Sequence, residues 1–293
     1  MAQYWSTLLS IGLFLVRAQA APASGHANGL ERRDADPDTL GFIIQHCTVP
    51  GVVALTFDDG PYIYTSHVLD LLSQYNASAT FFVNGDNMAH DLTDASTPWP
   101  EILRRMVRSG HQIGSHTMSH VDLTAASSAI RQTQVHELEY ALGHILGMVP
   151  TYLRPPYASC SLDCLREVEQ MGYRVVNFDL DTNDYLYNGP GAIQTAMNTF
   201  AAALDAGSPL SSSFLVLSHD TLRQTSEALV PFMLEKIRER GYTTVTVGEC
   251  LGHPAANWYR PPATQRRSFH GPRPGYVFGE AQEMQELDCH THG

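Results

Sequence analysis

The sequence predicts an α/β barrel of about seven parallel strands, closed or nearly closed, and three observations support this fold class. Short apolar runs rich in β-branched and aromatic residues alternate about seven times with segments of helical periodicity. Most of the runs are short and mainly apolar, which is typical of parallel strands that are buried on both faces. The alternation covers about 205 residues with no internal repeat and no G-x-G-x-x-G after the first run, so a barrel fits better than an open nucleotide-binding sheet.

The expected elements follow one another in a regular order. In chain order, the expected strands are 52–57, 79–83, 111–114, 151–153, 173–178, 214–217 and 243–247. The helices expected between and around them are 65–75, 99–109, 127–147, 161–171, 192–204 and 226–240. Because helices connect parallel strands, the carboxyl ends of all the strands are expected on one face of the barrel.

The segment before this region differs in composition. Residues 1–20 contain an apolar run that is too short to span a bilayer, followed by the small-x-small site Ala18-Gln19-Ala20. This pattern predicts a signal peptide, and therefore a secreted protein that is extracellular or in the cell wall. Residues 21–46 are polar and predict a linker or propeptide, in which the arginine pair at 32–33 offers a dibasic processing site.

The segment after it has no periodic apolar face. Residues 253–293 are therefore expected to be a flexible C-terminal tail, and a single folded domain is expected over residues 47–252. No further apolar stretch is long enough to cross a membrane, so no membrane span is expected. The sequon at 76–78 makes Asn76 a candidate glycosylation site.

Charge and basic-residue content exclude several functions. With 18 Lys+Arg against 30 Asp+Glu, the formal net charge is −12, which argues against a nucleic-acid partner. Lys236 is the only lysine, and it lies in an ordinary helical stretch, which disfavours a phosphate loop and a Schiff-base enzyme. We expect a monomer.

Ionisable side chains follow five of the expected strands. They are Asp58 and Asp59 after the first strand, His116 after 111–114, Arg154 after 151–153, Asp179, Asp181 and Asp184 after 173–178, and His219 after 214–217. In an α/β barrel the active site lies on the face formed by these carboxyl ends. Five such groups together therefore predict a site for metal and proton chemistry.

Two histidines in this set have the spacing of metal ligands. His116 and His120 are four residues apart, near enough to meet a single ion, and Asp58 or Asp59 would add a carboxylate. Such a two-His, one-carboxylate set leaves positions open for water and substrate. The same set suits non-haem iron oxygenases, so the ligands alone do not fix the metal.

The remaining groups favour hydrolysis of an amide or ester. Of the two adjacent aspartates, one can bind the metal while the other acts as a base on metal-bound water. His219 can act as the general acid, and a carboxylate of the 181–184 segment can keep it protonated. Arg154 can keep the aspartate that acts as the base ionised. A serine hydrolase is disfavoured because there is no G-x-S-x-G elbow.

Five motifs in this order resemble those of the polysaccharide deacetylase family (the NodB-homology domain, carbohydrate esterase family 4). TFDDGP at 56–61 and HTMSH at 116–120 resemble its first two motifs. RPPY at 154–157, DTNDY at 181–185 and LSH at 217–219 resemble the third, fourth and fifth, with a tyrosine where tryptophan is common in the fourth. The resemblance implies a distorted (β/α) barrel and metal-dependent removal of acetyl groups from acetylated sugars.

The resemblance also separates the two aspartates and assigns the metal and proton roles. Asp59, His116 and His120 would bind one divalent ion, usually zinc and sometimes cobalt. Asp58 would be the general base and His219 the general acid.

The resemblance further implies roles for residues around these groups. Arg154 would orient the base, Asp181 would tune the acid, and the backbone N–H of Tyr157 would help to hold the oxyanion. Tyr185 and Leu217 would line the substrate groove and the pocket for the acetyl methyl group.

The cysteines resemble those of one subgroup. RPPYASCSLDC is similar to fungal chitin deacetylases, which have cysteines at corresponding places, and this implies the bridges Cys47–Cys250 and Cys160–Cys164. An oxidising compartment permits both, and the alternative for the second pair is a zinc site. Cys289 is left over in the expected tail.

The resemblance to this subgroup predicts the substrate. We expect a hydrolase that acts on the linear amide of β-1,4-linked N-acetylglucosamine, converts chitin or its oligomers to chitosan, and releases acetate. The alternatives are an acetylxylan or peptidoglycan deacetylase, and a carbohydrate-binding protein without turnover. The last is disfavoured because base, three ligands and acid are all present in the sequence.

Overall fold

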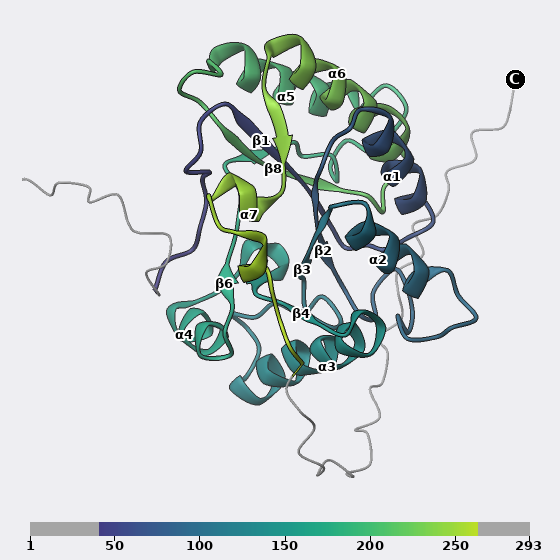
Figure 1. Cartoon of the computed structure of the whole chain (residues 1–293), viewed down its shortest axis with the longest axis vertical. Helices are drawn as coiled ribbons and strands as arrows, with labels where there is room; N and C mark the ends of the chain where they lie inside the picture. Colours follow the sequence, from purple (N-terminus) through teal and green to yellow (C-terminus); the bar gives the residue numbers. More distant parts are fainter. Residues whose placement is uncertain (1–40, 263–293) are drawn as a thin grey trace, which may run out of the picture. The chain divides into compact units, whose positions relative to one another are not determined.

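A curled parallel sheet forms the centre of the computed structural model, which describes residues 41–262 (Figure 1). Its strands are β1 (Val52–Asp58), β2 (Thr80–Val83), β3 (Gln112–Ser115), β5 (Tyr152–Leu153), β6 (Arg174–Val175), β7 (Leu180–Asp181), β8 (Phe214–His219) and β9 (Thr243–Val245). Seven of them lie in the order β6-β5-β3-β2-β1-β8-β7, and β9 pairs with β1 beside this path. The expected barrel is confirmed as a half-barrel, with β6 and β7 at its two ends.

Strand β1 lies at the centre of the sheet, and all seven of its residues are buried. One edge of β1 pairs with β8 from Val53 to Asp58, and the other edge pairs first with β9 and then with β2. In the β8 register, Asp58 lies opposite His219. The pairing therefore places the last residues of both strands at the same level of the sheet.

Helices cover the sheet in an order that follows the strands. They are α1 (Thr65–Gln74), α2 (Trp99–Arg108), α3 (Ser128–Leu146), α4 (Leu162–Gln170), α5 (Gln194–Ala206), α6 (Val230–Arg240) and α7 (Val247–Cys250). Neighbouring helices pack in the series α5-α6-α1-α2-α3-α4 around the sheet (Figure 1). Their apolar sides and one side of the sheet form the main core, which contains Leu69, Leu103 and Phe200 among others.

Local signals in the sequence explain where two of the helices begin and end. The Ser127 side chain accepts a hydrogen bond from the backbone N–H of Ile130 at the start of α3, and Gly147 ends this helix with a φ of 71°. The Ser161 side chain accepts from the N–H of Cys164 at the start of α4. These caps agree with the expected helices to within one or two residues.

The two disulfides that were expected are present. Cys47–Cys250 joins residues 203 apart in sequence, with the Cα atoms 4.9 Å apart. It links the segment before β1 to the end of α7, where the N–H groups of Thr48 and Val49 also donate to the Cys250 carbonyl. Cys160–Cys164 closes a four-residue loop just after the RPPY motif. The zinc alternative for this pair is therefore wrong.

The folded region extends beyond both predicted boundaries. Ile44, in the expected linker, forms a bridge with Val176. In the expected tail, β10 (Tyr259–Arg260) pairs with β4 (Val149–Pro150), and Trp258 is only 9% exposed. The prediction missed these segments because one or two residues that pair with a distant part of the chain have no periodic pattern.

Two further differences concern the strands. The expected strand 173–178 is shorter, since β6 ends at Val175, and β7 was not predicted. The expected strand 243–247 ends at Val245, because Thr246 caps α7.

No helix within residues 41–262 is long and apolar enough to cross a bilayer. The expected signal peptide at 1–20, residues 21–40 of the linker, and residues 263–293 with Cys289 lie outside the described part of the chain.

Candidate active site

The ionisable residues that follow the strands come together at one end of the sheet, as expected. Asp58 and His219 are the last residues of β1 and β8, and Asp181 is the last residue of β7. His116 directly follows β3, and Arg154 directly follows β5. Because these strands are parallel, their carboxyl ends form the same edge of the sheet.

Three of these side chains have the geometry of a metal site. Asp59, His116 and His120 each offer one ligand atom, and these atoms lie within 4.8 Å of one another. The Oδ1 atom of Asp59 is 3.2 Å from Nε2 of His120 and 3.5 Å from Nε2 of His116. Ligand atoms of a tetrahedral ion with bonds of about 2.0–2.1 Å are about 3.3 Å apart, so these spacings fit one ion.

Two further observations support a cation between these atoms. The Oδ1 atom of Asp59 is buried and has no hydrogen-bond partner among the described residues. Such an atom is costly to bury unless it is paired or bound to a cation. Burial lowers the pKa of His116 to about 3, so its imidazole is neutral, as a metal ligand must be. The Nδ1 atom of His116 lies 2.7 Å from the Arg154 carbonyl, which leaves Nε2 on the side of Asp59.

Asp58 is held by a buried arginine beside this triad. Arg154, 1% exposed, donates from Nη1 to Oδ1 of Asp58 at 2.9 Å, while Oδ2 of Asp58 lies 3.9 Å from Nε2 of His116. Burial raises the pKa of Asp58, and the Arg154 guanidinium acts against this shift. One carboxylate oxygen is thus fixed by Arg154, and the other lies toward the candidate metal ligands.

Further contacts hold Arg154 itself. Its guanidinium also donates to Oγ1 of Thr56 and to the Asn177 carbonyl, the latter at 2.7 Å. Its Cζ atom lies 4.3 Å from the centre of the Phe82 ring. These contacts fix the orientation of the guanidinium.

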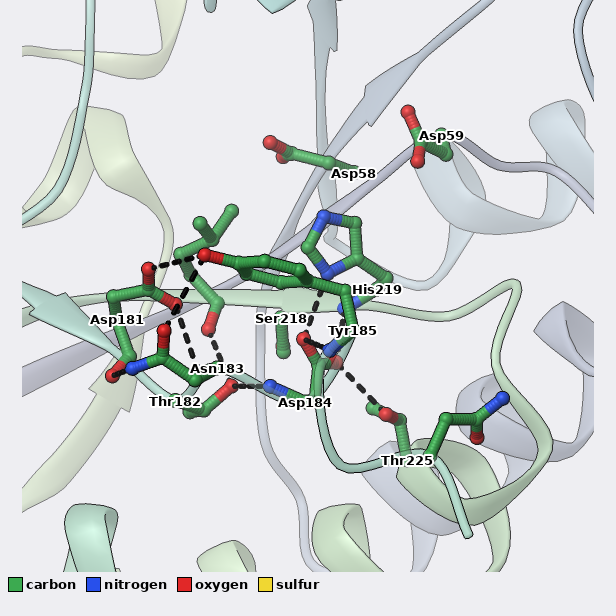
Figure 2. Close-up of polar contacts among 12 residues, drawn as sticks. Asp58, Asp59, Asp181, Thr182, Asn183, Asp184, Tyr185, Ser218, His219 and Thr225 are labelled. Atoms are coloured by element: carbon green, nitrogen blue, oxygen red, sulfur yellow. Dashed lines mark hydrogen bonds and ion pairs between the residues drawn. The ribbon is translucent and has the colours of Figure 1, made fainter. Parts of the chain in front are cut away.

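His219 is paired with Asp184. The Nδ1 atom of His219 lies 2.8 Å from Oδ1 of Asp184, and the backbone N–H of His219 donates to Oδ2 at 2.8 Å. Figure 2 shows the His219 ring with Asp184 and Tyr185 on one side and with Asp58 and Asp59 on the other. The family resemblance implied that Asp181 would tune His219. In the structure, the carboxylate that forms the hydrogen bond to His219 is that of Asp184.

Asp181 has a different partner. Its Oδ2 atom accepts a hydrogen bond from the Tyr185 hydroxyl at 3.1 Å (Figure 2). Asn183, between the two aspartates, has a φ of 56°, and this left-handed turn changes the chain direction between Asp181 and Asp184.

The surroundings of His219 favour its protonated form. Burial alone acts to lower its pKa, but the carboxylate of Asp184, its hydrogen bond, and the charges of Asp58 and Asp59 together raise the pKa to about 9. The raised pKa means that protonated His219 adds to the free energy of unfolding. This contribution is full below about pH 6.5 and is lost as the pH rises through about 9. At neutral pH, His219 carries the proton that a general acid needs.

Replacing Asp184 by asparagine lowers the pKa of His219. The expected value is about 6.5 or below, because burial is then opposed only by Asp58 and Asp59. A histidine NMR titration measures the shift, and Asp181→Asn is the matched control because Asp181 makes no hydrogen bond to His219 in the described structure. If the pKa of His219 falls more in Asp181→Asn than in Asp184→Asn, Asp181 is the residue that raises this pKa.

Two exposed tyrosines flank the candidate site. The Tyr157 ring is 70% exposed and lies 4.7 Å from the His120 ring, and Tyr157 itself has a left-handed φ of 58°. The Tyr185 ring is 48% exposed and meets the His219 ring edge-on at 5.4 Å. Leu217 is buried on β8, and it shares a face of this strand with His219 because side chains alternate along a strand.

Two polar residues near His219 were not predicted from the sequence. The Thr225 hydroxyl donates to Oδ2 of Asp184 at 2.8 Å and so completes its hydrogen bonds. Asp220 is buried beside the loop after β1 and accepts from the Thr65 hydroxyl, and burial raises its pKa to about 7. Asp220 could have been predicted from the sequence, because it directly follows His219. No sequence pattern indicates the contact of Thr225.

Asn76, the candidate glycosylation site, is exposed just after α1. The structure therefore leaves its side chain accessible, and its modification stays a prediction.

This chain is similar in sequence and structure to known deacetylases. The sequence model of the polysaccharide deacetylase family matches residues 45–176. A chitin deacetylase of Colletotrichum lindemuthianum is 41% identical over 249 residues, which are 85% of this chain and 98% of that protein. A chitin deacetylase of a Pestalotiopsis species is 45% identical over 232 residues, 78% of this chain and 73% of that protein. The solved structure of the chitin deacetylase from C. lindemuthianum matches with a TM-score of 0.73 and 41% identity, over 78% of this chain and all of that one (100%).

Proposed function

Because the chain belongs to the polysaccharide deacetylase family, we propose that it hydrolyses N-acetyl groups of β-1,4-linked N-acetylglucosamine in chitin or its oligomers and releases acetate. The observation that carries the reaction is the convergence of the metal triad, the Asp58–Arg154 pair and the His219–Asp184 pair at one sheet edge. The observation that favours chitin is the identity of 41–45% to two fungal chitin deacetylases over most of the chain.

The proposed cofactor is one zinc ion, with cobalt as the second choice. Asp59, His116 and His120 would hold it, since one oxygen and two nitrogen ligands suit zinc in a site that keeps positions open. When bound, such an ion polarises the amide carbonyl and lowers the pKa of water.

The proposed base is Asp58. It takes a proton from the attacking water, whose oxygen bonds to the amide carbon and remains in the released acetate. Its raised pKa strengthens it as a base, and the hydrogen bond from Arg154 holds it in place. The backbone N–H of Tyr157 is proposed to stabilise the oxyanion, as the resemblance of RPPY at 154–157 to the family's third motif implies.

The proposed acid is His219. It donates the proton on its ring nitrogen to the sugar nitrogen as the carbon–nitrogen bond breaks, so the amine leaves in a neutral form. Asp184 keeps the imidazolium stable and fixes the ring through Nδ1, which leaves Nε2 as the donor.

Exposed rings on two sides suit a sugar chain. Tyr157 and Tyr185 offer apolar faces with hydroxyl tips beside the metal triad and the acid, and sugar rings bind to such surfaces. Leu217, on the His219 face of β8, is proposed to contact the acetyl methyl group. We further propose that the protein is secreted and acts as a monomer.

Acetate release from a substrate panel tests this function. We expect rapid release from soluble chitin oligomers and slower release from crystalline chitin, acetylated xylan and peptidoglycan. The measurement is enzymatic acetate detection together with product mass spectra. Release from xylan with none from chitin oligomers would replace the substrate and keep the family. No release from any of the four would favour carbohydrate binding without turnover.

A further inference from the structure

The three proposed metal ligands come from two different loops. Asp59 lies in the loop after β1, whereas His116 and His120 lie in the loop after β3. In the sheet, β2 lies between β1 and β3, so the residue that follows β2 is flanked by both loops. That residue is Asn84, which is 2% exposed.

Asn84 makes hydrogen bonds to both loops. Its backbone N–H donates to the carbonyl of Gly60 at 3.0 Å, and Gly60 directly follows Asp59. Its side-chain Nδ2 donates to the carbonyl of His116 and to the carbonyl of Thr117, the latter at 2.9 Å. Both amide hydrogens of one side chain are thus used on successive carbonyls of the histidine loop.

The histidine loop adopts an unfavourable backbone conformation at this point. Thr117 has a φ of 71°, which is rare for a β-branched residue and is maintained only where the surroundings impose it. Two successive carbonyls can face one donor because the chain turns at Thr117. The turn lets the same short loop present His116 and, three residues after Thr117, His120 to one position.

The other side of the loop is held by α3. The carbonyl of Gln134 accepts from the N–H of Met118 at 2.9 Å, and its side-chain Oε1 accepts from the N–H of Ser119 at 2.8 Å. Gln134 therefore fixes the loop against the helix, and Asn84 fixes it against the loop that carries Asp59.

We propose that Asn84 is a positioning residue for the metal site, which fixes the spacing between Asp59 and the two histidines by joining their loops. This inference rests on the proposed metal site. A metal site tolerates only a few tenths of an ångström in its ligand distances, so a residue that sets the distance between two ligand loops sets affinity as well. Substitutions of groups that orient ligands typically weaken metal binding 10–100-fold.

Asn84→Asp tests the proposal with little change in shape. The carboxylate keeps an acceptor for the Asn87 side chain, but it cannot donate to the carbonyls of His116 and Thr117. We expect the zinc dissociation constant of the purified full chain, measured by competition with a chromophoric chelator, to rise about 10–100-fold. The visible spectrum of the cobalt-loaded variant should also change, because the ligand geometry changes.

Gln112→Glu is the matched control. It makes the same amide-to-carboxylate change at a fully buried position, and Gln112 pairs with Thr80 at the opposite end of β2 and β3. The control should lose stability and keep zinc affinity within about threefold of the unsubstituted chain, well below the effect of losing a group that orients a ligand. Asn84→Ser removes one of the two side-chain donor hydrogens and adds no charge, so it should also weaken zinc binding. This variant tests the proposal if Asn84→Asp does not fold.

Three outcomes overturn the proposal. Unchanged zinc affinity in folded Asn84→Asp, or in Asn84→Ser where only that variant folds, shows that the loops keep their spacing without this amide. Equal weakening in Gln112→Glu shows that general stability controls affinity. An unsubstituted chain that binds no divalent ion rejects the metal site itself, and with it the proposed function, so that failure is distinct from the other two.

Discussion

Replacing Asp58 by asparagine lowers kcat on chitin oligomers by about two to four orders of magnitude, which is the usual contribution of a positioned base. Asparagine has nearly the same shape as aspartate and can still accept the hydrogen bond from Arg154, but it cannot take a proton from water. Arg154 also donates to Thr56 and Asn177, so its guanidinium keeps partners in the variant. Steady-state acetate release measures the effect.

The neighbouring aspartate is the matched control for this substitution. Asp59→Asn removes the charge of a proposed ligand, so the dissociation constant for zinc should rise, while Asp58→Asn should keep one ion per chain. Metal content and melting temperature are measured beside kcat to separate chemistry from folding. Reversed phenotypes, with metal lost in Asp58→Asn and retained in Asp59→Asn, would exchange the roles of the two residues.

The fold was predictable because its signals are local and repeated. The central strand β1 begins as an apolar run, and the longer helices have buried residues that recur at helical spacing, as in α1 and α3. Such patterns do not depend on distant contacts. The placement of Trp258 and Tyr259 does depend on distant contacts. Trp258 belongs to a buried apolar cluster that includes Val52 and Tyr152, and the Tyr259 hydroxyl accepts a hydrogen bond from the N–H of Ile113 at 2.8 Å. No periodicity in residues 253–262 indicates either contact.

The positions of the proposed metal ligands and of the proposed base were predictable for a different reason. Asp58, Asp59 and His116 lie within one residue of a strand end, so the topology alone brings them to the same edge. The partner of His219 was not predictable in this way, because Asp181 ends the short strand β7 and Asp184 lies only three residues further along the chain. The left-handed turn at Asn183 decides between them, and sequence spacing does not reveal it.

Asn84 illustrates the same limit. It directly follows β2, but it is neither charged nor part of a motif with known metal-ligand spacing. Its proposed role arises from the position of β2 between β1 and β3 and from the turn at Thr117. Residues that position ligands are therefore found from hydrogen bonds to the ligand loops rather than from residue type.

Removing divalent metal abolishes acetate release, and adding zinc or cobalt restores it. The expected content of the purified protein is about one ion per chain, because Asp59, His116 and His120 form one cluster of ligand atoms within 4.8 Å. Dialysis against a strong chelator should bring turnover to the uncatalysed background, since Asp58 alone is too weak a base to activate free water. Elemental analysis of the same samples gives the metal content at each step.

Single histidine substitutions connect this loss to the triad. His120→Ala should lower both the zinc content and turnover, because it removes one of the three proposed protein ligands of the ion. His144→Ala is the matched control: His144 is exposed in the last turn of α3 and is not part of the triad, so both quantities should stay unchanged. Full turnover in a preparation shown by elemental analysis to be free of metal would reject the mechanism. Loss of zinc in His144→Ala with retention in His120→Ala would place the ion elsewhere in the protein.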